Sequence, residues 1–189
     1  MTSLSNSLND FEVDEHIYSE PWFTGFGDYL EVFQPTMVCG TTASLNEPNH
    51  ALISSSMALR FFGTTDAIGK TVYVDRKSRN QSLVIGGVYQ DMPENSQLGN
   101  CVFSSYSPNL NKDSWTNWNY ALYIRLDNPA SLADVLQSVI EACKRMIPKD
   151  LISGEGEEDW ENFIHFTPLD EVHYSTVGNK AATSKAAVY

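Results

Sequence analysis

Histidine is the side chain that most often carries protons or binds metal near neutral pH, and the sequence holds four of them. His165 and His173 lie eight residues apart, where a strand is predicted to run into a loop. A helical zinc site uses the phrase H-E-x-x-H, which does not occur here. His16 and His50 also lack a carboxylate partner fixed by spacing. The pattern therefore favours surface or core-edge histidines over a metal or catalytic centre.

Nucleophile and phosphate-binding patterns are equally incomplete. The serine cluster 54–56 lacks a surrounding G-x-S-x-G and fits the start of a helix better. The run 69–71 (Gly-Lys-Thr) ends like a P-loop, but Thr64 occupies the position of the upstream glycine, and a strand rather than a helix should follow. Glu157 and Glu158 lie in a polar loop without an apolar wall to raise a pKa. We therefore expect no enzyme activity, no cofactor and no metal.

Composition narrows the class further. The 189 residues are 42% hydrophobic and 12% aromatic, which predicts a globular chain of one domain or two small lobes. Twelve Lys and Arg face 24 Asp and Glu, for a net charge of -12. Such a surface repels phosphate, so we expect no nucleic-acid partner and no adhesion to anionic lipid.

Cysteine usage excludes zinc and thioredoxin-type sites, because Cys39, Cys101 and Cys143 include no C-x-x-C pair. Cys101 and Cys143 fall in apolar patterns and are predicted to be small buried hydrophobes. One disulfide stays open as an alternative. No stretch approaches the roughly 18 apolar residues of a membrane span, and residues 1–10 lack the pattern of a signal peptide. Composition alone does not separate an exported domain from a cytosolic protein.

Elements in the first two thirds of the chain follow from local patterns. Loose alternation predicts a strand over 11–17, and the aromatic residues between 22 and 33 are predicted to be core. A helix should begin at the serine cluster and stop at Gly63, which accepts a left-handed conformation. Strands at 71–74 and 83–89 should then form a hairpin, with a bulge at Gly86-Gly87.

Further strands are predicted at 101–103, 120–126 and 163–166, with an exposed loop between 107 and 119. Between the last two strands, apolar residues recur at spacings of three and four, the pattern of an amphipathic helix. They are Leu132, Val135, Leu136, Val139, Ile140, Cys143 and Ile147. Ser131 and Asp134 resemble a capping box, and Pro148 should end the helix. Strands with few long helices indicate an α+β or mixed α/β domain rather than a doubly wound sheet.

Four phrases in the right order carry a family resemblance. The first runs from an apolar-x-Ser phrase at 51–54 through Phe62-Gly63 to Asp66-Ala67-Ile68-Gly69-Lys70. It is similar to the "F-G … D-P-I-G-K" phrase of MacB-like periplasmic core domains of ABC permeases, with Ala67 in place of Pro. The second phrase, 83–93, is similar to "V-x-G-V-x-x-D-x-P" and is followed by Asn95-Ser96, as in a Bacteroidetes-like branch of the family. The third, 120–136, resembles the family's unit of a tyrosine-rich strand, a small-residue turn and a helix. The fourth, 166–173, is similar to "x-P-L-x-x-I-H".

The resemblance covers residues 29 to 189, whereas residues 1–28 match poorly. It implies a two-lobed mixed α/β extracytoplasmic domain of the MacB/FtsX family. The single domain 1–189 would have a membrane-proximal lobe (1–45 and 115–189) and an inserted β-rich lobe (46–114). Structural motif residues carried over from the family are Phe62, Gly63, Ile68, Gly69, Lys70, Gly87, Val88, Pro93, Pro168 and Leu169.

The resemblance also implies a function. The domain would hang between two membrane helices on the periplasmic face of the inner membrane. It would couple ATP hydrolysis by a separate cytoplasmic ATPase to movement outside the membrane. Implied partners are the permease's own membrane helices, that ATPase, a periplasmic adaptor or lipoprotein, and a second permease copy, the isolated domain being a monomer. The first alternative is a stand-alone secreted binding or adhesion domain. The second, less favoured alternative is a hydrolase that uses His165 or His173.

Overall fold

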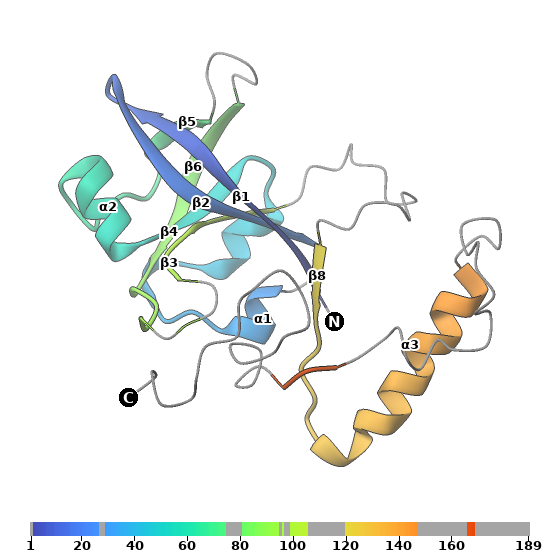
Figure 1. Cartoon of the computed structure of the whole chain (residues 1–189). Helices are drawn as coiled ribbons and strands as arrows, with labels where there is room; N and C mark the ends of the chain where they lie inside the picture. The colour runs from blue at the N-terminus through green and yellow to red at the C-terminus, as the bar shows by residue number, and fades with distance from the viewer. Residues whose placement is uncertain are drawn as a thin grey trace. The chain divides into compact units, whose positions relative to one another are not determined.

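A computed structural model describes residues 2–26, 29–74, 81–94, 96, 99–105, 120–146 and 166–168. The chain divides into two compact units, Met1–Arg125 and Leu126–Tyr189. The first unit holds every strand of the described residues together with two short helices, and the second holds a long helix (Figure 1). The α+β class predicted from the sequence is confirmed.

The chain begins with a long antiparallel ribbon, the β1–β2 ribbon. It pairs β1 (Thr2–Val13) with β2 (His16–Phe26) along its whole length. The turn between them is Asp14-Glu15, and both residues have positive φ (47° and 68°). A two-residue turn of this hand matches the twist of the strands. The prediction of one strand over 11–17 is therefore wrong at its centre, where Asp14 and Glu15 form a turn. Turns of this kind are usually signalled by Asn-Gly or Asp-Gly, and neither pair stands at these positions.

The remaining strands of the first unit join the ribbon in one eight-stranded sheet (Figure 1). They are β3 (Met37–Gly40), β4 (His50–Ser54), β5 (Thr71–Val74), β6 (Gln81–Tyr89), β7 (Val102–Ser105) and β8 (Tyr120–Tyr123). The order is β2-β7-β4-β6-β5-β1-β8, and β1 also pairs with β2. The pairings among β1, β2, β4, β5, β6 and β7 therefore form a closed circuit, to which β3 and β8 are attached at β6 and β1.

The central part of the unit follows the prediction closely. After β4, helix α2 (Ser55–Phe62) ends at Gly63, whose φ of 69° is left-handed, and the β5–β6 hairpin follows. The predicted bulge is present in β6. Ala51 pairs with Ile85 and Leu52 with Gly87, so one extra residue is accommodated.

Two apolar clusters form the core of the first unit. The larger includes Phe11, Ile53, Phe61 and Ile85 and packs α2 against the sheet. The smaller gathers Phe23, Leu45, Leu52, Tyr89, Cys101 and Phe103, with partly buried residues of α1 (Tyr29–Phe33) packed against it. Leu45 comes from the short 3-10 helix Thr42–Asn46. Because β4 contributes Leu52 to one cluster and Ile53 to the other, it is buried on both faces.

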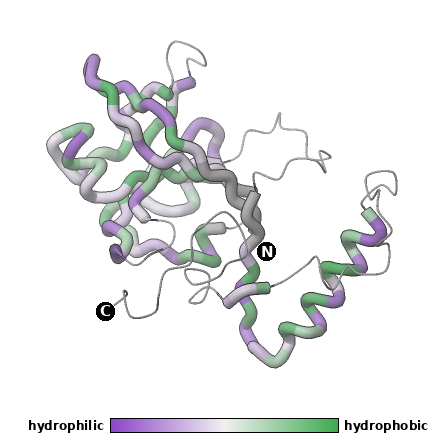
Figure 2. The backbone as a smooth tube through the Cα atoms, in the orientation of Figure 1, coloured by the Kyte–Doolittle hydropathy of each residue, from purple (hydrophilic) through white to green (hydrophobic). Residues whose placement is uncertain are grey.

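The second unit contains the predicted amphipathic helix as α3 (Leu132–Met146), along which hydrophobic and hydrophilic residues alternate (Figure 2). Its predicted capping box is wrong. Ser131 belongs to a preceding 3-10 turn (Pro129–Ser131), and its hydroxyl donates to the Asn128 carbonyl instead of accepting at the helix start. The side chain of Asn128 caps this 3-10 turn by accepting from the Ala130 N–H.

Several predictions fall outside the described residues, namely those on 107–119, Ile147, Pro148, 153–161, 163–165 and the end of the chain. Phe166 is described and is not in a strand. The division into two lobes also stays a prediction, although strands from both predicted ranges pair in one sheet. Within the part of the chain that the structure describes, no helix has the length and apolar character of a membrane span.

Candidate functional site

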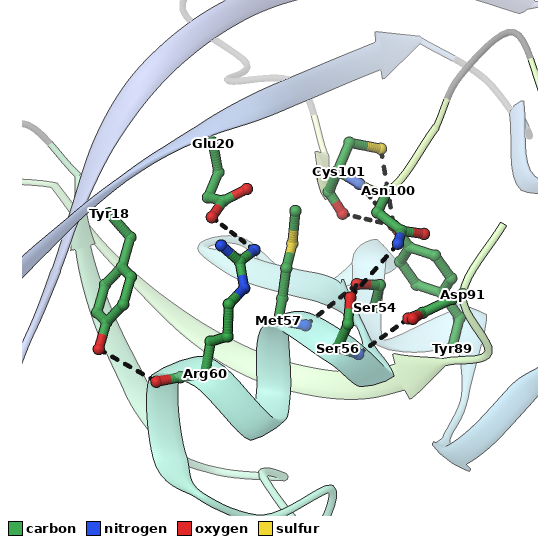
Figure 3. A network of polar contacts seen from close by, with 10 residues as sticks. All are labelled: Tyr18, Glu20, Ser54, Ser56, Met57, Arg60, Tyr89, Asp91, Asn100 and Cys101. Carbon is green, nitrogen blue, oxygen red and sulfur yellow. Dashed lines mark hydrogen bonds and ion pairs between the residues drawn. The ribbon is translucent and has the colours of Figure 1, made fainter. Parts of the chain in front are cut away.

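Polar contacts of the first unit gather at the two ends of α2, and we treat this helix with its neighbours as the candidate site (Figure 3). Its first turn lies beside the segment that follows β6. Its last turn lies against β2 of the ribbon. The helix therefore connects two segments that are far apart in the sequence.

The N-terminal end of α2 is capped twice. Ser54 Oγ accepts from the Met57 N–H at 3.3 Å. Asp91 Oδ1 accepts from the Ser56 N–H and from Ser55 Oγ, both at 2.9 Å. Because the first N–H groups of a helix lack intrahelical partners, both contacts stabilise its start. The predicted capping role of the serine cluster is confirmed, whereas the contribution of Asp91 was missed, because its 35-residue separation from Ser56 leaves no local signal.

The environment of Asp91 also sets its ionisation. Burial opposes the charged form, but the hydrogen bonds from the Ser56 N–H and from the hydroxyls of Ser55, Ser56 and Ser54 outweigh that effect. Together they hold the pKa of the Asp91 carboxyl below its ordinary value. The carboxylate is therefore charged at neutral pH and complements the positive end of the helix dipole.

A second side chain ties the segment after β6 to the helix. Asn100 Oδ1 accepts from the Met92 N–H at 2.8 Å, and Asn100 Nδ2 donates to Ser56 Oγ at 3.4 Å. Nearby, the Tyr89 hydroxyl donates to the Cys101 carbonyl at 2.6 Å and accepts from the Cys101 N–H at 2.8 Å. The Tyr89 and Asn100 side chains thus hold the two ends of the segment 90–100 together, and Asn100 also reaches α2.

Burial makes this pair unsuited to proton transfer or nucleophilic attack. It raises the pKa of the Tyr89 hydroxyl, and it raises the pKa of the Cys101 thiol to about 12. A nucleophilic cysteine needs a thiolate, which a pKa this high suppresses at neutral pH. Tyr89 and Cys101 therefore act as a structural clamp.

The C-terminal end of α2 is held by β2. Arg60 Nη2 lies 2.6 Å from Glu20 Oε1, and the Tyr18 hydroxyl donates to the Arg60 carbonyl at 3.1 Å. The Glu20 side chain is only 9% exposed, whereas that of Arg60 is half-exposed. The Phe61 ring lies 4.7 Å from that of Tyr18 and 6.5 Å from that of Phe11. The sequence carried no local sign of this ion pair, because its partners are 40 residues apart.

The structure brings several predicted motif residues together just after α2. Lys70 Nζ lies 5.0 Å from the centre of the Phe62 ring, a cation–π contact. The Gly69 N–H donates to the Ile85 carbonyl, and the Ile85 N–H donates to the Lys70 carbonyl, both at 2.8 Å. The Gly63 N–H closes the helix by donating to the Leu59 carbonyl at 2.9 Å. The phrase thus anchors the end of α2 to β6.

The other predicted motif residues differ in their burial. Gly87 and Val88 are buried in β6, Pro93 and Ile68 are exposed, and Pro168 lies exposed in the second unit. Leu169 lies outside the described residues. Within the described part of the first unit, contacts connect Phe62 with Lys70 and join Gly69 and Lys70 to β6, and a role for the whole set stays a prediction.

The two histidines that the structure describes, His16 and His50, share no site. His16 Nδ1 lies 2.9 Å from the Asp14 carbonyl oxygen, and His50 Nε2 lies 3.6 Å from Glu47 Oε2. His165 and His173 fall outside the described residues. In the ranges that the structure describes, no three His, Cys, Asp or Glu residues are grouped to hold a metal ion.

Taken together, the contacts around α2 define a structural module in which capping, clamping and ion pairing fix a helix on a sheet. Comparison with known proteins then places the chain in a family. A family model described as the MacB-like periplasmic core domain matches residues 5–142, so the chain belongs to this family. It is a periplasmic domain of a MacB-like ABC transporter permease. No curated protein sequence gives a significant match.

Solved structures show the same fold. A domain of a protein assigned as a permease in Porphyromonas gingivalis is 22% identical, with a TM-score of 0.66 over 79% of this chain and 65% of that one. The periplasmic region of MacB from Actinobacillus actinomycetemcomitans is 17% identical (TM-score 0.52, 79% and 72% covered). The extracellular domain of the noncanonic ABC-type transporter YknZ from Gram-positive bacteria is 15% identical (TM-score 0.54, 76% and 74% covered). The chain spans 65% of the length of the Porphyromonas gingivalis domain.

Proposed function

We propose that the domain is a passive mechanical coupling module of its permease. ATP hydrolysis in a separate cytoplasmic ATPase would move the membrane helices, and the domain would carry that movement to a partner or cargo outside the membrane. The domain itself would perform no chemistry. Its energy would arrive through the segments that connect it to the rest of the permease.

The register between β1 and β8 is the observation that supports this proposal most directly. Thr2 pairs with Tyr123 and Ser5 with Tyr120, antiparallel. The first residue of β1 and the last residue of β8 therefore lie side by side at one end of the sheet. A movement that arrives through the segment before β1 and one that arrives through the second unit, which follows β8 in the sequence, would therefore act on the same end of the sheet.

The closed circuit of pairings supports the same proposal. β1 is paired with β2 along one edge and with β5 and β8 along the other. A displacement of β1 therefore acts on strands along both of its edges. A strand paired along only one edge could instead separate from the sheet. Such a sheet would transmit a movement with little internal deformation.

The nucleophilic and titratable groups around α2 are engaged in structure, which also favours a non-enzymatic role. Asp91 caps the helix, Cys101 is buried against Tyr89, and Glu20 is paired with Arg60. The partners of the working module would be the permease's membrane helices, its ATPase, a second permease copy, and an adaptor or lipoprotein that receives the movement.

The proposal can be tested in the complete permease with its ATPase in lipid nanodiscs. A spin label would be placed at the exposed turn by Glu15→Cys, with Cys39 and Cys143 replaced by Ala and the buried Cys101 kept. Pulsed electron paramagnetic resonance would then give the distance between the labels of two permease copies. We expect this distance to change with ATP, and to stay constant with an ATPase variant unable to hydrolyse it.

Identical distance distributions in the presence and absence of hydrolysis would overturn the coupling role. Turnover of a substrate by the purified chain alone would favour a hydrolase. A parent gene without apolar segments of about 20 residues flanking the domain would favour a secreted binding domain.

A further inference from the structure

Glu20 is the one charged residue among the buried residues of the described ranges. It points from β2 to the same face as the apolar Phe11, Val13 and Trp22, which belong to the larger core cluster. A carboxylate in such surroundings loses hydration, and only a well-placed partner compensates for that loss. Its partner is Arg60 of α2, at 2.6 Å (Figure 3).

An apolar residue in place of a buried ion pair is often no less stabilising, so such a pair is weak evidence for a role in stability alone. What an ion pair adds is direction, because a charge-assisted hydrogen bond holds only in a narrow geometry. The pair between Glu20 and Arg60 therefore fixes where α2 sits along the β1–β2 ribbon.

The other contacts between α2 and the ribbon do not fix this position by themselves. Phe61 packs against Phe11 and Tyr18 through ring contacts, and apolar contact is non-directional. The hydrogen bond from the Tyr18 hydroxyl also ends on Arg60, at its carbonyl. The ion pair and this hydrogen bond thus converge on one residue of the helix.

The ribbon continues from this contact to the far end of the sheet. β1 has 12 residues, which at the usual rise of a strand spans roughly 36 Å. Its first residues pair with β8, and its last residues lie beside β5. Movement applied at the β1–β8 end would therefore travel along the ribbon before it reaches α2.

We propose that Arg60 is the joint that makes α2 and the β1–β2 ribbon move as one arm. This inference rests on the proposed function, since a joint matters only if the domain carries movement. Arg60 acts as a positioning residue: it holds the helix on the ribbon, and the helix in turn holds the segment 90–100 through Asp91 and Asn100.

The test is hydrogen–deuterium exchange of the whole 189-residue chain, read peptide by peptide under native conditions. Arg60→Met keeps the aliphatic stem and removes the charge. We expect exchange in the ribbon (residues 8–13 and 16–21) and in α2 to accelerate about tenfold, because these elements open together once the joint is lost. Exchange in β4 and β6 should stay unchanged.

A matched control is Lys70→Met, which removes a cation that contacts α2 but not the ribbon. It should leave exchange in the ribbon unchanged. The charge swap Glu20→Arg with Arg60→Glu should restore most of the protection. Uniform acceleration that includes β4 and β6 would overturn the proposal, because the ion pair would then stabilise the whole unit. No acceleration anywhere would overturn it as well, because the ion pair would then have no effect on opening.

If Arg60→Met fails to fold, the milder Arg60→Lys replaces it in the same experiment. The proposal is again judged by whether exchange accelerates in the ribbon and α2 but not in β4 and β6. This variant keeps a charge but loses the planar fork that matches a carboxylate. The exchange experiment uses no ATPase and no membrane. A negative result therefore rejects the joint alone, whereas constant spin-label distances in the complete permease reject the proposed function.

Discussion

The Tyr89 hydroxyl and the backbone of Cys101 exchange two hydrogen bonds, one in each direction, at 2.6 and 2.8 Å. A single side chain therefore satisfies both backbone groups of a residue that is fully buried. The arrangement joins the end of β6 to the residue that precedes β7.

Tyr89→Phe should destabilise the domain. The substitution keeps the ring in the core but leaves the Cys101 N–H and carbonyl without a partner, which we expect to lower the free energy of unfolding by about 3 kcal/mol. Urea unfolding followed by circular dichroism measures the change. Tyr18→Phe is the matched control, because it removes one hydrogen bond in an exposed position and should cost less than about 1 kcal/mol. Equal losses in the two variants would contradict the clamp.

The same burial should make Cys101 the least reactive thiol. With its pKa at about 12 and no exposed surface, Cys101 offers almost no accessible thiolate at pH 8. We expect alkylation with iodoacetamide, followed by peptide mass spectrometry, to modify the half-buried Cys39 and Cys143 first. Cys101 should react only in denaturant. Native labelling of Cys101 at the rate of Cys143 would show that the segment opens readily.

How far the sequence predicts this fold depends on the range of the interactions. Ser54 and Gly63 mark the ends of α2 through contacts with residues three or four positions away, so both were predictable. The Asp14-Glu15 turn was missed because acidic residues usually do not adopt left-handed conformations in pairs.

The candidate site was less predictable because long-range partners create it. Asp91 reaches Ser56 across 35 positions, and Glu20 reaches Arg60 across 40. Composition and spacing say nothing of such pairs. The family phrases did mark the region, since they contain Asp91 and the residues that follow α2.

Gly40 should tolerate alanine less than Gly69 does. Both glycines have positive φ (72° and 79°), so alanine at either position should cost about 1–2 kcal/mol from backbone strain alone. A methyl group on Gly40 would also lie 2.6 Å from the Gly87 Cα, whereas nothing lies within 4 Å of one on Gly69. We expect Gly40→Ala to cost at least about 3 kcal/mol in urea unfolding. Equal costs would mean that β3 can shift away from β6.

Asp91→Asn should destabilise the domain in a pH-dependent way. Asparagine keeps an oxygen that accepts from the Ser56 N–H but loses the charge that favours the start of a helix, so we expect a loss of about 1 kcal/mol at pH 7. The pKa of Asp91 is lowered in the folded state, so its charge contributes stability above the ordinary carboxyl pKa. That contribution disappears as the pH falls through the lowered value. The unfolding curves of the two proteins should therefore differ at pH 7 and converge once the pH has fallen below the lowered pKa of Asp91. A difference that stays constant over this range would show that the charge of Asp91 does not stabilise α2, and that its oxygen acts only as a neutral acceptor.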